Sequence, residues 1–240
     1  MKQYFLGLIT RCKDEFFIKE FCDYYISQGV NKIYVIDDDS DDKSIYNNIT
    51  NKHVEIVYET NVFKTFNRKS WDQMHTVNKL YKTIRNKFEW LISVDVDEFI
   101  TTKRHKNNTI KRELKTTFKN IDCVCVPWVM MSSNGRKKNP KRILLENTYR
   151  WNHDLKHKKV EKKYGKFRCL YNRIQIKCIF KTNKFDTIMV HYPLSSNNRK
   201  RLGVDSKKTQ YIKYKWKKLR KYDYAEIKDE TLKNKIKGIK

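Results

Sequence analysis

Short apolar runs separated by polar segments divide the first hundred residues of the chain. Each run is rich in branched and aromatic residues, which is typical of strands buried on both faces of a sheet. The pattern predicts strands at residues 4–9, 32–36, 53–58 and 90–94. Two of the intervals between them have helical periodicity, so we expect an α/β fold with parallel strands and helical crossovers.

The first helix is predicted from Phe17, Phe21 and Tyr24, which recur at helical spacing; Asp14 can cap its start and Gly29 can end it. A second helix is predicted after a capping box at residues 70–73. Its apolar stripe consists of Met74, Val77, Tyr81, Ile84 and Phe88. Both helices are expected to pack on the sheet.

Acidic residues follow two of the predicted strands. Residues 37–42 form an acidic, turn-like loop, and Asp95, Asp97 and Glu98 follow the fourth strand. Open α/β sheets bind ligands at the carboxyl ends of their strands. In an extended chain Asp95 and Asp97 project to the same side, so their oxygens can converge on one hard cation, Mg²⁺ or Mn²⁺. Three carboxylates in a dry site also need a cation to remain ionised together.

The formal net charge of +27 is concentrated in the second part of the chain. Residues 1–100 carry 14 basic and 16 acidic residues, whereas the other 140 residues carry 40 and 11. An excess of this size suggests a polyanionic partner such as nucleic acid or a membrane surface. The nearly neutral first part therefore needs a separate explanation.

Other signatures exclude several classes of protein. No apolar stretch approaches the length of a membrane span, and the N-terminus lacks a secretory cleavage site, so we expect a non-secreted, cytoplasmic protein. The six cysteines lie in apolar runs without a zinc-ligand spacing, which predicts buried free thiols. Neither a GxGxxG nor a P-loop motif is present, which argues against Rossmann dinucleotide-binding proteins and P-loop NTPases.

Motifs in a fixed order resemble the GT-A glycosyltransferases, and more closely the family 92 group related to family 2. The matching segments are residues 11–21, 24–25, 28–30, 33–38, Ser40, Asp42, Gln73, 90–99, 126–128, 132–135, Glu146, 149–150, 177–180 and His191. The resemblance implies a Rossmann-like α/β fold in which a mixed sheet is flanked by helices. Residues 130–135 and Asp39 depart from the usual family pattern, which leaves the donor and acceptor open.

The resemblance also implies roles for individual residues. Arg11, Glu15 and Asp37 are expected to contact the base, ribose or phosphate of a nucleotide-sugar donor, with a UDP-sugar as the first expectation. Trp128 is expected to line the sugar pocket.

For the metal site, the resemblance implies Mn²⁺ or Mg²⁺ on Asp97, with Asp95 on the ribose or the metal and His191 as a further ligand. Such a cation offsets the charge that develops on a departing nucleoside diphosphate. A carboxylate would then accept the proton of the acceptor hydroxyl in an inverting transfer. Glu146 is the first candidate for this base and Asp154 the second.

The expected organisation is one glycosyltransferase domain over residues 1–196, with nucleotide and metal binding in 1–100 and acceptor binding in 101–196. Residues 197–240 would form a basic, aromatic-containing tail, helical around Tyr211 and Lys218. A glycan, lipid or protein acceptor is expected, with an anionic membrane or polyanion as a possible partner of the basic part. A bacterial or viral protein of the cytoplasm fits this reading.

Two other functions stay open from the sequence. A metal-dependent nuclease or nucleotidyltransferase could use Asp95 and Asp97 on a polynucleotide held by the basic part. A binding module that kept the fold is the non-enzymatic alternative, and the intact DxD motif argues against it.

Overall fold

The computed structural model describes residues 2–58, 70–103, 105–136, 138–152, 176–188, 209–213 and 224–237. Its strands are β1 (Tyr4–Cys12), β2 (Lys32–Asp37), β3 (Val54–Tyr58), β4 (Phe88–Ser93), β5 (Glu98–Thr102), β6 (Cys123–Met130), β7 (Tyr149–Arg150), β8 (Ile176–Lys181), β9 (Thr209–Lys213) and β10 (Ile227–Lys228). Its α-helices are α1 (Ile18–Ser27), α2 (Ser70–Ile84), α3 (Ile110–Lys115), α4 (Ile143–Glu146) and α8 (Thr231–Ile236). Short 3₁₀ helices span Lys43–Tyr46 and Arg85–Lys87.

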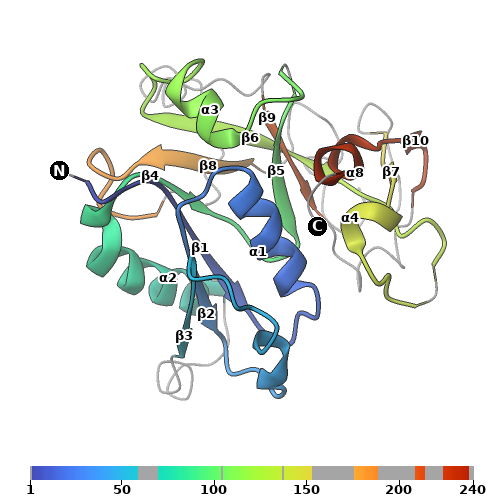
Figure 1. The fold of residues 1–240 in the computed structure, drawn as a ribbon, viewed down its shortest axis with the longest axis horizontal. Coiled ribbons are helices and arrows are strands. Elements are labelled where there is room, and N and C mark those ends of the chain that lie inside the picture. The colour runs from blue at the N-terminus through green and yellow to red at the C-terminus, as the bar shows by residue number, and fades with distance from the viewer. Residues whose placement is uncertain are drawn as a thin grey trace.

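Eight of the described strands form a mixed sheet in the order β3-β2-β1-β4-β8-β6-β9-β5, and β7 and β10 form a separate antiparallel pair (Figure 1). Strands β3, β2, β1 and β4 run parallel, as predicted from their apolar runs. Strand β8 runs antiparallel to both β4 and β6, while β9 runs parallel to β6 and antiparallel to β5. The mixed sheet with flanking helices confirms the predicted fold class and is compatible with the Rossmann-like GT-A fold.

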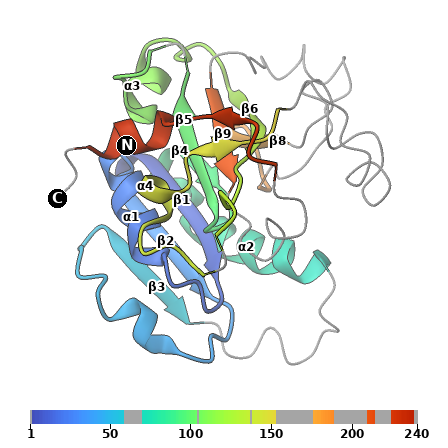
Figure 2. The same cartoon turned by 90° about the vertical axis from the view of Figure 1, so that its right-hand side faces the viewer.

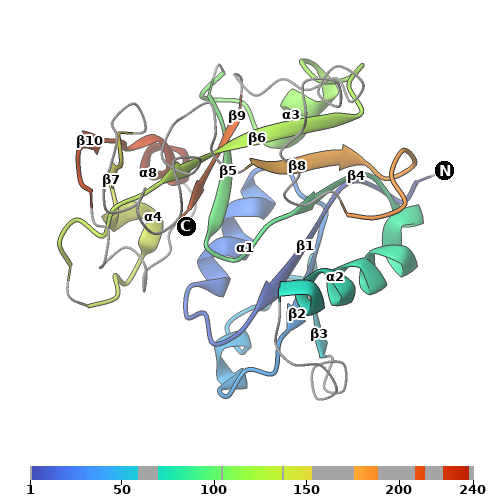
Figure 3. The ribbon, with the colours of Figure 1, turned by 180° about the vertical axis from the view of Figure 1, so that it is seen from behind.

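Helices α1 and α2 cover opposite faces of the parallel strands. Figure 1 shows α1 in front of the sheet, and Figure 3, from behind, shows α2 in front. Successive side chains of a strand point to opposite faces. Accordingly, Leu8 of β1 packs in the same cluster as Phe21 of α1, whereas Ile9 packs with Tyr81 of α2. Both faces of β1 are therefore buried, which explains its unbroken apolar sequence.

Two details of the predicted helices are wrong. Phe88 shares the helical spacing of α2 but begins β4, because the 3₁₀ turn at Arg85–Lys87 ends the helix before it. Asp14 does not cap α1; its Oδ1 accepts the backbone N–H groups of Asp41 (2.8 Å) and Asp42 (3.3 Å) instead. Asp14 thus ties the loop after β1 to the acidic loop after β2.

The C-terminal segment contributes to the main sheet. The helix expected around Tyr211 is wrong, because residues 209–213 form β9, which pairs with both β5 and β6. Lys218 lies outside the described residues. Helix α8 lies over the end of α1 (Figure 2). There Lys235 Nζ donates to Thr102 Oγ1 (2.7 Å), the Asn108 carbonyl (2.8 Å) and Gln28 Oε1 (3.4 Å).

Burial lowers the pKa of Lys235 to about 8, although the nearby Glu113 carboxylate acts in the opposite direction. Between pH 8 and the ordinary lysine pKa near 10.5, the unfolded chain therefore binds a proton that the folded chain has released, and stability rises with pH. We expect the Tm advantage of wild type over Lys235→Met to grow between pH 7.5 and 9.5. Thermal unfolding at both pH values measures it, with Lys233→Met, at a surface pair with Glu230, as the control. A constant Tm difference for Lys235→Met would contradict the expectation.

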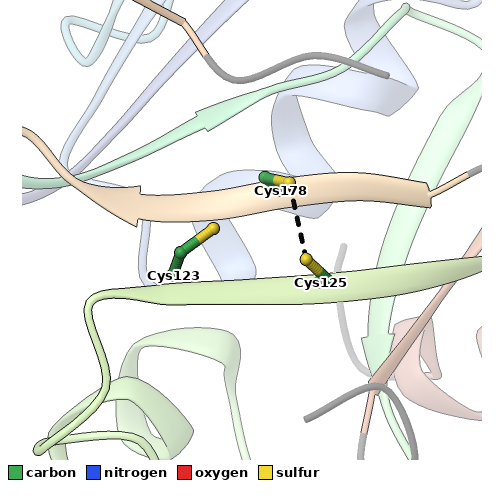
Figure 4. A group of neighbouring side chains, drawn as sticks. All are labelled: Cys123, Cys125 and Cys178. Carbon is green, nitrogen blue, oxygen red and sulfur yellow. Dashed lines mark hydrogen bonds between the residues drawn. The ribbon is translucent and has the colours of Figure 1, made fainter. Parts of the chain in front are cut away.

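Three cysteines meet between β6 and β8 (Figure 4). Their sulfur atoms lie within 4.8 Å of one another, with 3.8 Å between the sulfurs of Cys125 and Cys178. The neighbouring thiols and burial raise the pKa of Cys178 well above its ordinary value, which keeps this thiol protonated. The five described cysteines are buried and free, as predicted, and Cys169 lies outside the described residues.

Candidate active site

Three carboxylates gather where β4 ends and β5 begins. One oxygen from each of Asp95, Asp97 and Glu98 lies within 4.8 Å of the others. These residues form a tight turn rather than the extended segment that the sequence suggested. In this turn the Glu98 N–H donates to the Asp95 carbonyl (3.0 Å), and the Asp95 N–H donates to Glu98 Oε2 (3.0 Å). The turn brings together the residues that the DxD motif singled out.

The three carboxylates differ in their exposure. The Asp95 side chain is 52% exposed, whereas that of Glu98 is 1% exposed and Asp97 is half-buried. A buried lysine from β8 faces them: Lys177 Nζ lies 3.1 Å from Glu98 Oε2 and 3.5 Å from Asp95 Oδ2. The turn therefore has one buried, ion-paired carboxylate and two that are more accessible.

The donor chemistry of this cluster fits a hard divalent cation. Carboxylate oxygens are the ligands that Mg²⁺ and Mn²⁺ prefer. Among the described residues, Lys177 Nζ lies within reach of two of these carboxylates, and a divalent cation would supply further positive charge to the three.

A second polar group lies at the ends of β1 and β2, where Cys12 and Asp37 are paired in register. The Arg11 guanidinium forms an ion pair with Asp38. Asp37 is only 2% exposed, and its Oδ1 accepts the Tyr46 hydroxyl (2.7 Å) and the Ser40 N–H (3.3 Å). The Asp37 carboxylate thus forms hydrogen bonds with residues of the segment that follows β2.

Glu15 is half-buried in the loop between β1 and α1, and its carbonyl accepts the Ile18 N–H at 3.1 Å. The Glu15 carboxylate lies close enough to the Cys12 thiol to raise its pKa, although burial is the main reason that this pKa rises to about 11. Glu15 therefore lies near Cys12, which is paired in register with Asp37 at the carboxyl ends of β1 and β2.

Glu146 ends the short helix α4, and both of its carboxylate oxygens have partners. Oε2 lies 2.7 Å from an Arg136 guanidinium nitrogen, and Oε1 accepts the Arg142 N–H at 2.8 Å. Helix α4 is held against α1 by Glu20, whose Oε2 accepts the Ile143 N–H at 2.8 Å. The first candidate for the general base is therefore also a residue that orders its own loop.

Three predicted site residues cannot be placed by their side chains. Asp154 and His191 lie outside the described residues, and of Trp128 the structure describes the backbone, which pairs with Tyr211 in β6 and β9. The sequence reading gave no role to Lys177 or Tyr46. Lys177 could have been recognised because it lies between apolar residues of β8, where a lysine is rarely buried without a partner.

A polar cavity of about 700 Å³ lies elsewhere, between the end of α1, the start of α3 and the segment from β10 to α8. Lys235, Arg150 and Asp229 are among its lining residues, which include none of the predicted site residues that the structure describes. Arg150 is paired with Asp229 across 3.1 Å, so part of the charge in this cavity is already balanced.

The mixed sheet makes the chain an α/β protein with acidic residues at the carboxyl ends of parallel strands, where open α/β sheets bind ligands. Comparison with protein families identifies it as a glycosyltransferase. The model of Glycosyltransferase family 92 matches residues 13–238, so the chain belongs to this family. The enzyme class predicted from the motifs is confirmed.

Among solved structures, the chain is similar to 4-diphosphocytidyl-2C-methyl-D-erythritol synthase from Anaerococcus prevotii, with 12% identity and a TM-score of 0.38. The match covers 98% of this chain and 96% of that one. A similarity this distant does not indicate a shared function. No match is found among curated proteins. Within the described residues, no helix has the length and hydropathy needed to cross a membrane.

Proposed function

We propose that the chain is a metal-dependent glycosyltransferase that moves a sugar from a nucleotide-sugar donor to an acceptor hydroxyl with inversion. The observation that carries the proposal is the cluster of Asp95, Asp97 and Glu98 at the end of β4, in a chain of family 92. This membership also favours glycosyl transfer over the nuclease or nucleotidyltransferase alternative.

Asp95 and Asp97 would hold Mn²⁺ or Mg²⁺, and His191 stays a proposed third ligand. When bound, such a cation would offset the charge of the departing diphosphate. The chain's own contribution is to present the exposed Asp95 and the half-buried Asp97 from one tight turn, which the buried ends of β4 and β5 keep in place.

Arg11, Glu15 and Asp37 would bind the nucleotide, for which a UDP-sugar is the first choice. Asp37 acts in this proposal by fixing the loop after β2 through Tyr46 and Ser40. Because Arg11 is paired with Asp38, its guanidinium is oriented before a donor arrives. Trp128 is proposed to contact the sugar.

A panel assay tests the proposed function. Purified protein is incubated with Mn²⁺ and individual nucleotide sugars, and release of the nucleoside diphosphate is measured with and without EDTA. We expect one donor to be turned over and EDTA to abolish that turnover. Absence of turnover and of thermal protection with every donor, together with tight binding of single-stranded nucleic acid at physiological salt, would contradict the proposal.

Glu146 is the described candidate for the general base, with Asp154 as the second. We expect Glu146→Gln to lower kcat by about 100-fold while the KM for the donor changes little, because an amide cannot accept the acceptor's proton. Steady-state kinetics with the donor found in the panel measures the effect.

Arg136→Gln is the matched control for Glu146→Gln, because it removes the ion pair and keeps the carboxylate. Its kcat should stay within a few fold of wild type. A Glu146→Gln variant with normal kcat and a lowered Tm would assign Glu146 to holding the α4 loop alone.

The acceptor is proposed to be a glycan, lipid or protein bound by the second part of the chain. The charge excess of residues 101–240 supports an acceptor that is polyanionic or lies at an anionic membrane surface.

A further inference from the structure

The buried ammonium group of Lys177 has no role in the function proposed above. Its side chain is 2% exposed, and Glu98, the nearest carboxylate among the described residues, is 1% exposed. Burying either charge alone would be costly, so each requires the other. The distance of 3.1 Å between Lys177 Nζ and Glu98 Oε2 is that of a direct ion pair.

The same oxygen of Glu98 also accepts a hydrogen bond. Glu98 Oε2 also accepts the backbone N–H of Asp95 at 3.0 Å, and the Glu98 N–H donates back to the Asp95 carbonyl at 3.0 Å. These two hydrogen bonds close the turn that carries Asp95 and Asp97. Glu98 therefore connects Lys177 to the position of Asp95.

We propose that Lys177 and Glu98 form an internal ion pair that positions Asp95, and that Glu98 is not one of the carboxylates that hold the divalent cation. This inference rests on the proposed metal site. In this arrangement Lys177 balances the charge of Glu98, and Asp95 and Asp97 are the two carboxylates assigned to the cation.

Lys177 interacts more strongly with Glu98 than with Asp95, so it competes only weakly with a cation for Asp95. The ammonium is nearer to Glu98 (3.1 Å) than to Asp95 (3.5 Å). The Asp95 side chain is also 52% exposed, so its charge is solvated and its pairing with Lys177 is weaker than that of the buried Glu98. Lys177 is thus paired more closely with Glu98 than with Asp95.

A double-mutant cycle tests the proposal, using the affinity for Mn²⁺ alone, measured by electron paramagnetic resonance of the free ion. Glu98→Gln should raise the Kd about 10-fold to 100-fold, because Lys177 then has Asp95 as its nearest carboxylate and competes with the cation. The double variant Lys177→Met with Glu98→Gln should bring the Kd back to within about threefold of wild type, since both charges are gone.

The alternatives predict different results. If Glu98 were a ligand, the double variant would bind Mn²⁺ as weakly as Glu98→Gln. If the pair were merely structural, Glu98→Gln would lower the Tm without changing the Kd. Either result would overturn the proposal. Lys181→Met is the matched control: Lys181 lies four residues along β8 and pairs with Asp122 across 3.0 Å, so its loss should leave the Kd unchanged.

Thermal unfolding provides the second readout. Lys177→Met alone should lower the Tm by about 10 °C, because it leaves Glu98 buried without its counter-ion, and the double variant should recover most of this loss.

If wild type binds no Mn²⁺, alone or with a nucleoside diphosphate, both the proposed metal site and the inference that rests on it are wrong. If wild type binds Mn²⁺ and the double variant does not recover, only the inference fails.

Discussion

Asp97→Asn is expected to lower the kcat/KM of sugar transfer by at least about 100-fold in a protein that remains folded. Asp97 is half-buried in the turn between β4 and β5, within reach of the other two carboxylates. Asparagine keeps the size of the side chain and removes one negative charge, so it weakens cation binding without opening a cavity. Release of nucleoside diphosphate at a Mn²⁺ concentration that just saturates wild type measures the loss, and circular dichroism shows whether the fold is retained.

Asp41→Asn is the matched control, because Asp41 is an exposed aspartate in the acidic loop after β2. It should keep kcat/KM within about twofold of wild type, as expected for a surface substitution. Normal activity in Asp97→Asn, or an equal loss in Asp41→Asn, would show that the acidic turn has no special place in the reaction.

Phe99→Ala is expected to destabilise the protein by about 3–5 kcal/mol. Phe99 follows Glu98 directly, is fully buried, and packs against the rings of Phe21, Tyr24 and Tyr25 in α1. Removing its ring would leave a cavity where the strand after the acidic turn is anchored to the helix. Urea unfolding measures the loss of free energy, and the Tm should fall by about 6–20 °C.

Phe16→Ala makes the same chemical change at a surface position, because Phe16 is 43% exposed. It should cost less than about 1 kcal/mol. Equal losses at the two positions would mean that the aromatic cluster around Phe99 does not stabilise the acidic turn.

The parallel half of the sheet could be predicted from sequence because each strand is a local apolar run. Residues 32–36 and 90–94 are recognisable without knowledge of their partners. The end of α2 could not be predicted in this way. Phe88 continues the helical spacing, and only the hydrogen bonding of the turn before it shows that a strand has begun.

The pairing of β9 with β5 and β6 could not be predicted from local sequence patterns. Residues 209–213 have aromatic and branched residues compatible with a strand, but their spacing also allows a helix. Pairing with β5 and β6, each about eighty residues or more away in sequence, decides for the strand. The contact of Lys177 with Glu98 depends on the same kind of long-range pairing, so the DxD motif could be found and its counter-ion could not.

The position of β9 also sets the order in which the site can be completed during synthesis. Strand β5 follows the acidic turn directly, yet its partner among the described strands is β9, which is made more than a hundred residues later. Lys177 likewise arrives with β8, long after Glu98 has left the ribosome. Pairings between such distant segments form late. The nascent chain can therefore assemble its parallel strands early, whereas the acidic turn gains Lys177 and β9 only after about eighty and more than a hundred further residues have been made.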